Sequence, residues 1–473
     1  MKVDSCFYLQ EMKPVFKELL DELLLRYPYA SILAADVECK SYAVSAHGTS
    51  VTESNEFGKR AFTVRVYSNG GYAEYSAVSL KKEDIPEILT VISRDILQQT
   101  SCYSRFDTPL SDDSPLSFVK SSDFVTDPSL LGDGEIIKRL TELRSKGMAM
   151  DSRLLDVNCR FGYQKYHKLF LSRNRDLEQN ILYSDTAIAM LARKDDEVKD
   201  AYKSFSCLGG AEVLNHLDGC MSDLVQTVTD LLKSEPIIPG EYDCICTPEV
   251  TGMIVHEAFG HGVEMDMFVK DRALARNFVG KRVASDLIVM RDGANTGYDD
   301  VATFFFDDEG NPASDTLVID KGILVSGYAD EVSARRLGIN PTGNGRRESV
   351  DHKAYTRMTN TYFLEGNDSL EDMITSIEYG FLLECPTSGM EDPKNWGIQC
   401  MVSFAREIRN GKMTGNIFSP IVLSGYVPDL LKSISMVGKE VEHCGSGYCG
   451  KGHKEWVKVS DGGPYIKARI RLG

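Results

Sequence analysis

Two histidines five residues apart constrain the local backbone of this chain more than any other feature. His256 and His261 lie in the segment Ile-Val-His-Glu-Ala-Phe-Gly-His-Gly. On a regular α-helix a step of five residues turns the side chain by about 140°, whereas a step of four turns it by about 40°. The two rings can therefore face one point only if the helix widens by one residue or ends between them. Gly260 and Gly262 flank His261, and glycine permits either backbone.

The residues before these histidines are typical of a helix start. Thr247 can cap the helix, Pro248 suits the first helical position, and Glu249 favours the positive end of the helix dipole. His256 and Glu257 then follow about two turns into the helix.

A histidine pair with an adjacent glutamate indicates a metal site. Zinc peptidases commonly place two histidines on one helix face beside a glutamate, but two imidazoles need a third protein ligand to hold zinc tightly. The candidates are Glu264, Asp266, or a distant histidine or cysteine. Cys449 lies among glycines that would let its sulfur approach an ion, and zinc would stabilise its thiolate. An isolated cysteine is nevertheless more often a small buried apolar residue.

Length and charge narrow the class of protein. The 473 residues predict two domains. The formal net charge of −17 disfavours nucleic-acid binding, because an acidic surface repels phosphate. We expect no membrane span, no secretory signal and a cytoplasmic location, since no apolar run is long enough. The twelve cysteines in so long a chain are expected to be mostly reduced and buried.

Residue patterns predict an α+β fold. Helical periodicity predicts helices at 11–27, 84–99, 134–147 and 221–233. Alternation predicts strands at 61–79, 154–172 and 180–207, and a hairpin at 316–328. Short helices are expected near Ser369 and Pro428, and the Ser-, Asp- and Pro-rich segment 100–133 is expected to be a loop. The break at Pro236–Gly240 separates a domain at 1–235 from one at 236–473.

Five motifs, in this order, resemble those of the TldD/PmbA peptidase family, whose members were once described as modulators of DNA gyrase. More narrowly, the chain is similar to the TldD branch, which keeps the metal motif. The motifs are His256-Glu-Ala-Phe-Gly-His261-Gly-Val-Glu264-Met-Asp266, Asp307-Asp-Glu-Gly310, Pro341-Thr-Gly-Asn-Gly-Arg-Arg-Glu-Ser349, Arg357-Met-Thr-Asn-Thr-Tyr362 and Cys449-Gly-Lys-Gly452. A looser similarity surrounds Phe62-Thr-Val-Arg-Val-Tyr67.

The resemblance implies a zinc metallopeptidase with an HExxxH motif. It implies zinc bound by His256, His261 and Cys449, with Glu257 as the general base. It further implies an N-terminal domain of split β-α-β type, followed by a strand-rich metal-binding domain. Substrates would be unfolded or extended peptides, cleaved inside a homodimer or a heterodimer with a PmbA-type subunit. The family usually has a glutamine soon after the Cys449-Gly-Lys451 stretch, whereas this chain reads Gly452-His453-Lys454-Glu455-Trp456, so substrate contacts near this strand are left open.

Further polar residues in the motifs have alternative roles. Glu264 and Asp266 either orient the histidines or lie at the surface. Arg346 and Arg347 either contact a substrate carboxylate or oxyanion, or form structural ion pairs. Asn360 is either a substrate contact or a strand residue.

Two other functions compete with the peptidase. One is a non-catalytic, metal-stabilised binding subunit or regulator of a partner protein, and a closed site with His443 or Cys444 as fourth ligand would favour it. The other is a thiol enzyme that uses Cys449 and His453. Glu257 favours the peptidase, because a structural metal site needs no base.

Overall fold

The first half of the chain forms one long antiparallel sheet with a single parallel edge pair. The computed structural model describes residues 1–473 except 54–59, 69–70, 103–113, 299 and 453–454. The sheet has the order β4-β3-β1-β6-β7-β5, with β2 beside β1 and β8 beside β7. Its strands are β1 (Tyr29–Ser45), β2 (Gly48–Glu53), β3 (Ala61–Ser68), β4 (Gly71–Ala77), β5 (Leu116–Ser121), β6 (Leu154–Ser172), β7 (Arg175–Lys194) and β8 (Glu197–Cys207).

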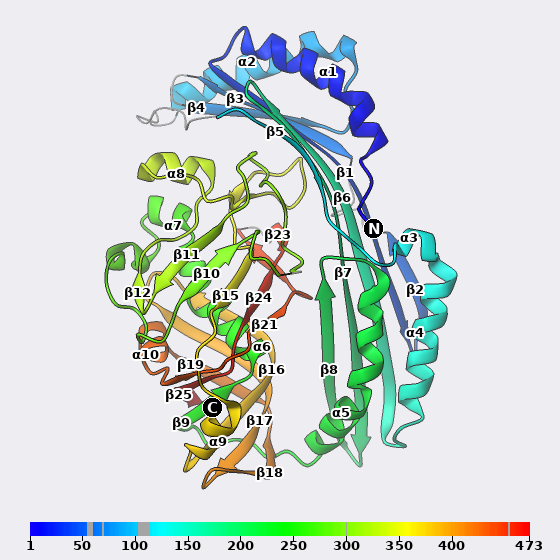
Figure 1. Ribbon diagram of the computed structural model, residues 1–473, viewed down its shortest axis with the longest axis vertical. Helices are drawn as coiled ribbons and strands as arrows, with labels where there is room; N and C mark the ends of the chain where they lie inside the picture. Colours follow the sequence, from blue (N-terminus) through cyan, green and yellow to red (C-terminus); the bar gives the residue numbers. More distant parts are fainter. Residues whose placement is uncertain (54–59, 69–70, 103–113, 299, 453–454) are drawn as a thin grey trace.

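Helices cover this sheet at two places (Figure 1). Helices α1 (Phe7–Leu24) and α2 (Ile85–Cys102) bury their apolar sides against β1 and β3 at one end of the sheet. Helices α4 (Asp133–Met148) and α5 (His216–Leu231) pack on β6, β7 and β8 at the other end. Short helix α3 (Pro128–Leu131) precedes α4. The opposite face of the sheet turns towards the second half of the chain (Figure 1).

The second half contains a closed barrel. Strands β9, β25, β19 and β17 follow one another in the sheet, and β16 pairs with both β9 and β17, which closes the ring. The bounds are β9 (Gly240–Cys246), β16 (Tyr379–Asp392), β17 (Gly397–Arg409), β18 (Lys412–Phe418), β19 (Ile421–Tyr426), β20 (Met436–Val437) and β25 (Ile466–Leu472). Helices α9 (Leu370–Thr375) and α10 (Val427–Lys432) lie beside it.

A second sheet lies between the barrel and the long N-terminal sheet (Figure 1). Its order is β12-β11-β10-β15-β24-β21, and two small ribbons, β13–β14 and β22–β23, accompany it. The strands are β10 (Met290–Gly293), β11 (Asp315–Asp320), β12 (Ile323–Leu324), β13 (Gly345–Arg346), β14 (Tyr355–Thr356), β15 (Asn360–Phe363), β21 (Glu442–Cys444), β22 (Tyr448–Lys451), β23 (Glu455–Lys458) and β24 (Ser460–Gly463). Helices α7 (Met265–Val269) and α8 (Glu331–Leu337) complete this region.

Most of the predicted elements are present within a few residues of their expected bounds, and the chain is a strand-rich mixture of helices and sheets. The predicted loop at 100–133 is wrong in part, because β5 and α3 form within it. Residues 103–113 of that segment, and 69–70 between the strands predicted within 61–79, lie outside the described residues. The hairpin at 316–328 is confirmed as β11 and β12, which turn at Lys321 and Gly322, both with positive φ.

Two expectations about organisation stay predictions. Strands β4 and β5 are connected through α2 and run parallel, but β3, β1, β6 and β7 separate them, so the split β-α-β assignment is left as a prediction. The boundary between residues 235 and 236 also stays a prediction. Among the described residues, no helix has the length and apolar character needed to cross a membrane.

Candidate metal centre

The helix that carries the histidines widens where the five-residue spacing predicts it. Helix α6 (Pro248–Met253) continues into a π-helical segment, η3 (Ile254–Gly260), and then a 3₁₀ turn, η4 (His261–Val263). The backbone N–H of His261 donates to the carbonyl of His256, a five-residue step that defines the wider turn. The expectation that the helix accommodates the odd spacing is therefore confirmed.

Close packing requires a small residue in this turn. A Cβ on Gly260 would lie 2.4 Å from the sulfur of Met358, and the hydroxyl of Tyr328 donates to the Gly260 carbonyl. At the start of the helix, Pro248 takes the first helical position as expected. Thr247 does not cap: its hydroxyl is buried without a hydrogen-bond partner.

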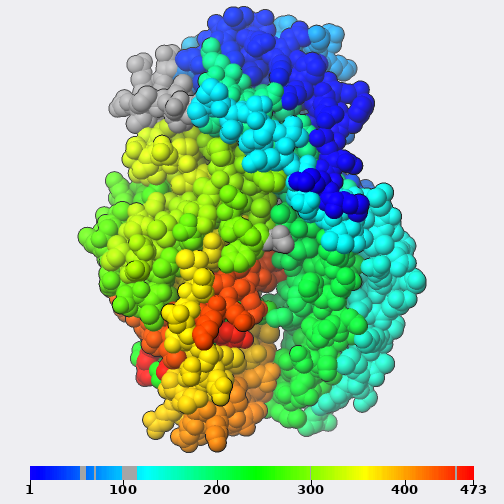
Figure 2. Space-filling view, viewed as in Figure 1, coloured from blue at the N-terminus to red at the C-terminus, as the bar shows by residue number. Residues whose placement is uncertain are grey.

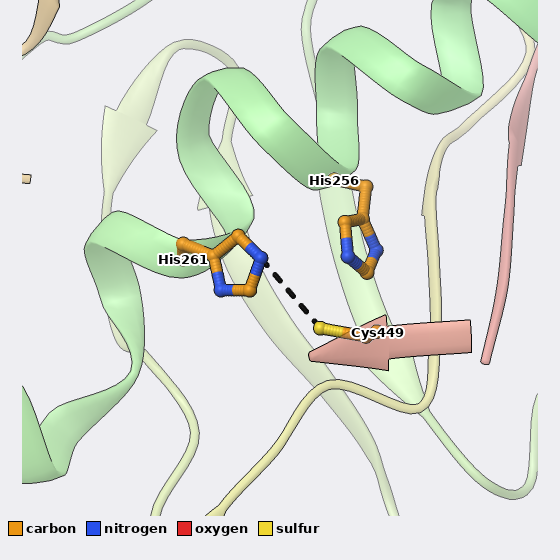
Figure 3. Close-up of side chains that lie close together, drawn as sticks. All are labelled: His256, His261 and Cys449. Carbon is orange, nitrogen blue, oxygen red and sulfur yellow. Dashed lines mark hydrogen bonds between the residues drawn. The ribbon is translucent and has the colours of Figure 1, made fainter. Parts of the chain in front are cut away.

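The wide turn and strand β22 bring three potential metal ligands together (Figure 3). One ligand atom from each of His256, His261 and Cys449 lies within 4.8 Å of the other two. The Cys449 sulfur lies 3.6 Å from Nε2 of His261, and the two imidazole rings are almost perpendicular, at 88°. Among the residues that the structure describes, this is the one group of three such side chains close enough to share an ion.

Charges within this group favour an ionised thiol. Burial alone would raise the pKa of Cys449, but the imidazoles of His261 and His256 oppose it and hold that pKa well below its usual range. Burial raises the pKa of Glu257, partly offset by the same two imidazoles. The Glu257 carboxylate lies 3.8 Å from Nε2 of His261.

A chain of charged side chains supports His261. Its Nδ1 lies 3.3 Å from a carboxylate oxygen of Glu264, and the ammonium of Lys451 lies 3.1 Å from the same oxygen. Lys451 also donates to Asp266 at 2.7 Å and to the carbonyl of Thr356 at 3.0 Å. Glu264 and Asp266 are both buried, so they are not surface carboxylates.

Arg357 and Lys451 lie in the motifs Arg357–Tyr362 and Cys449–Gly452, but their roles depend on contacts that the fold creates. The buried guanidinium of Arg357 donates to the carbonyl of Cys449 at 2.6 Å and to that of Glu455 at 3.0 Å. Because Cys449 lies in β22 and Glu455 in β23, these two bonds hold Arg357 against both strands of the ribbon. No local pattern signals this contact, because 92 residues separate Arg357 from Cys449.

Other candidate residues fall outside the ligand group. Asn360 is fully buried, and its side-chain amide bonds to Ala302, Gly293 and Ser460; a substrate contact by this residue stays a prediction. Arg347 is buried and pairs with Glu74 of β4.

The residues suggested as a fourth ligand, His443 and Cys444, lie close to other polar groups outside the ligand group. His443 Nδ1 lies 2.9 Å from Asp300, and the Cys444 sulfur lies 3.6 Å from the hydroxyl of Ser446. His453 lies outside the described residues.

A cleft leads to the centre from the side of the N-terminal sheet. It has a volume of about 230 Å³, and His256, Glu257 and Asp461 border it. Residues 202–204 of β8 form one wall and residues 385–389 of β16 the other. Figure 2 shows a hollow between the green N-terminal segments and the yellow, orange and red segments of the second half. Asp461 was not a candidate in the sequence; burial raises its pKa to about 6, although the nearby imidazole of His256 opposes this rise.

A protein-family model matches the half of the chain that contains the candidate metal centre. Residues 239–470 match the model of the PmbA/TldA metallopeptidase C-terminal domain. A metalloprotease of Methanothermobacter thermautotrophicus is 29% identical over 60% of this chain and 63% of its own length. A TldD homologue of Buchnera aphidicola is 34% identical over 50% of this chain and 48% of its own. The alignments thus span about half to two thirds of these relatives.

Solved structures share the whole fold. TldE from Thermococcus kodakarensis superposes with a TM-score of 0.77 at 18% identity, covering 97% of this chain and 99% of that one. A putative modulator of DNA gyrase from Thermotoga maritima gives 0.77 at 17% identity, covering 98% and 100%. Because the matched domain contains the histidine pair and the cysteine in their expected order, and the fold agrees from end to end, the chain belongs to the TldD/PmbA family.

Proposed function

We propose that this protein is a zinc-dependent peptidase that hydrolyses extended or unfolded peptides. His256, His261 and Cys449 would hold the ion, and Glu257 would act as general base. The observation that carries the proposal is a cleft bordered by His256 and Glu257, where His256 belongs to a group of three ligand residues close enough to share an ion. A zinc metalloprotease TldD homologue of Saccharolobus solfataricus, 27% identical over 72% of this chain, adds support.

The donor set suits zinc. Tetrahedral zinc with bonds of about 2.0–2.3 Å keeps its ligand atoms about 3.5 Å apart, close to the 3.6 Å between the Cys449 sulfur and the His261 nitrogen. Two imidazoles and a thiolate are borderline-soft ligands, which zinc prefers. In addition, Nδ1 of His256 is buried without a hydrogen-bond partner, and such an atom costs free energy unless it finds one.

Glu257 would move protons in the proposed reaction. When bound, the ion would supply Lewis-acid chemistry, polarising a carbonyl and making water more acidic. Glu257 borders the cleft and would accept a proton from the attacking water, then deliver it to the departing amine. Glu264 would accept from Nδ1 of His261, which fixes the tautomer and leaves Nε2 free to bind metal. A set of three protein ligands would suit a catalytic zinc site, which keeps one position for water, and this favours the enzyme over the binding subunit.

The cleft wall suits an extended substrate. Strand β8 pairs with β7 along one edge, and among the described residues no strand pairs with its other edge. A peptide that adds to such an edge gains main-chain hydrogen bonds whatever its side chains are. Specificity for sequence would then be loose. Enclosure in a homodimer, or in a heterodimer with a PmbA-type subunit, stays a prediction, and so does a cytoplasmic location.

We expect cleavage of unfolded chains and none of folded domains. A folded domain can donate a strand only after local unfolding, which costs up to its global stability. The measurement compares one small domain in its native form with a variant that mutation keeps unfolded. A chelator should abolish cleavage of the unfolded form, and added zinc should restore it. Equal rates on both forms, while the native form stays folded, would contradict the proposal for extended substrates.

Replacement of Lys451 by methionine should weaken zinc binding by about tenfold, at the low end of the range for residues that orient metal ligands. Lys451 bridges Glu264 and Asp266, so its loss leaves two buried carboxylates without their cation and loosens the support of His261. A competing chelator measures the affinity directly. Lys270→Met is the matched control, because Lys270 pairs with Asp266 from the exposed side. Equal zinc affinities in the two variants would remove Lys451 from the support.

A further inference from the structure

A second cavity adjoins the cleft at Tyr448. Its volume is about 80 Å³, which is room for on the order of five water molecules, at about 15 Å³ each. Tyr448, the residue before Cys449, borders both the cleft and this cavity. Tyr166 and Tyr183 of the N-terminal sheet and Phe304 provide aromatic walls. The cavity is therefore next to the candidate metal centre and large enough for one side chain or a chain end.

Most charges that border this cavity are already neutralised. Lys168 forms an ion pair with Asp308, and Lys458 lies 2.8 Å from Asp185. Arg347 pairs with Glu74.

The remaining carboxylates also have partners. Glu348 lies 2.9 Å from a ring nitrogen of His352. Asp307 accepts three backbone N–H groups, from Glu309, Asn311 and Gly345. Burial, with repulsion from Glu309, raises the pKa of Asp307, and these three backbone donors oppose the rise.

Arg346 is the exception. Its guanidinium donates to two carbonyls, those of Met358 and Lys458, each at 2.7 Å. Among the described residues, no carboxylate lies within 4.0 Å of it. Arginine has five N–H donors, so three remain after these two bonds. The group also lies over the ring of Phe304, 5.5 Å from its centre.

The surroundings of Arg346 favour an anion. Burial and the nearby Arg357 lower the pKa of Arg346, and attraction by Asp308 offsets only part of this effect. A partly buried cation without a paired carboxylate carries an uncompensated desolvation cost. An incoming carboxylate would reduce that cost and match the planar fork of the guanidinium. The two carbonyl bonds hold this fork in place before any ligand arrives.

We propose that this cavity is a subsite for a carboxylate of the peptide substrate and that Arg346 is the residue that recognises it. The proposal rests on the proposed peptidase function and defines its substrate class: peptides with a carboxylate a few residues from the scissile bond. That carboxylate is either the C-terminus of the peptide or the side chain of an aspartate or glutamate. The adjacent residue Arg347 is already paired with Glu74. We therefore assign a structural role to Arg347 and the recognition of the carboxylate to Arg346.

Binding of short peptides tests this subsite. The probe is a fluorophore-labelled, otherwise neutral pentapeptide in four forms: C-terminal acid, C-terminal amide, amide with an internal glutamate, and amide with glutamine at that position. Binding is measured by anisotropy to zinc-loaded Glu257→Gln protein, in which hydrolysis is slowed. One or both carboxylate forms should bind about 10- to 100-fold more tightly than the neutral isostere, the usual effect of a hydrogen bond to a charged group. The carboxylate form that binds more tightly than its neutral isostere shows whether the C-terminus or a glutamate side chain occupies the subsite.

Variants assign the effect to Arg346. Adding Arg346→Gln should abolish the gain from a carboxylate. The matched control is Lys168→Gln with Asp308→Asn, which removes a cation of the same cavity together with its partner and should keep the gain. If Arg346→Gln does not fold, Arg346→Lys is used instead. It keeps the positive charge without the planar fork, so the gain in affinity from a carboxylate should fall.

Two results would overturn the proposal. One is equal affinity for all four peptides in the Glu257→Gln protein. The other is an undiminished gain in a folded Arg346 variant. Binding is measured without turnover, so a failure of this proposal is distinct from an absence of hydrolysis by the wild-type protein.

Discussion

Replacement of Glu257 by alanine should lower peptide hydrolysis by about 10²- to 10⁴-fold, the usual contribution of a general base, while the zinc content stays the same. The carboxylate borders the cleft and lies 3.8 Å from Nε2 of His261, but it is not among the three clustered ligand atoms. Its loss should therefore remove proton transfer and spare the metal. Turnover of an unfolded peptide and elemental analysis of the same protein sample measure both effects.

A second variant acts on Glu257 without changing it. A Cβ on Gly389 would lie 2.4 Å from Cγ of Glu257 and 2.7 Å from its Cβ. Gly389→Ala should therefore displace the carboxylate and slow hydrolysis, with zinc retained. For comparison, Glu249→Gln changes another carboxylate of the cleft, one that pairs with Lys203, and should lose far less activity. If Glu257→Ala keeps most of the wild-type turnover, another group takes the proton.

Local backbone features could be predicted from the sequence because their causes are local. The five-residue spacing of His256 and His261 has few solutions on a helix, and the structure adopts one of them, the wide turn. Strand β6 spans the predicted 154–172, since alternation along one strand needs no partner to be recognised. The capping pattern at Ser369 likewise precedes a helix, with the serine hydroxyl accepting from the N–H of Asp372.

Long-range pairings could not be predicted. The barrel closes because β16 pairs with β9 on one side and with β17 on the other, and no periodicity within β16 specifies a partner more than 130 residues away. Strand β5 was missed because its segment has the composition of a loop. It becomes a strand by pairing in parallel with β7 at the edge of the sheet, where half-buried side chains need little apolar character.

The same limit applies to the support of the site. Lys451 reaches Asp266 across 185 residues, and Arg346 and Arg347 are neighbours in sequence with different surroundings. Arg347 pairs with Glu74, whereas Arg346 donates to the carbonyls of Met358 and Lys458. The motifs indicated which residues matter, but the assignment of a role to each needed the partners that the fold supplies.

Replacement of Cys449 by serine should remove zinc from the protein. A hydroxyl is a far poorer zinc ligand than a thiolate, because it stays protonated and is a harder donor. Even residues that only orient a metal ligand contribute about 10- to 100-fold to affinity, so loss of a direct ligand should cost more than about 100-fold. The fold should survive, because Arg357 bonds to the backbone carbonyl of residue 449, which serine retains.

Cys444→Ser is the matched control for this prediction. Its thiol lies five residues earlier in the same segment and contacts Ser446 outside the ligand group, so zinc binding should be unchanged. An ion that binds the folded state alone raises the free energy of unfolding in proportion to the logarithm of its concentration over Kd. Added zinc should therefore raise the Tm of the wild type and of Cys444→Ser, and much less that of Cys449→Ser. Full zinc retention by Cys449→Ser would exclude Cys449 from the site and leave His256 and His261 to find a third ligand elsewhere.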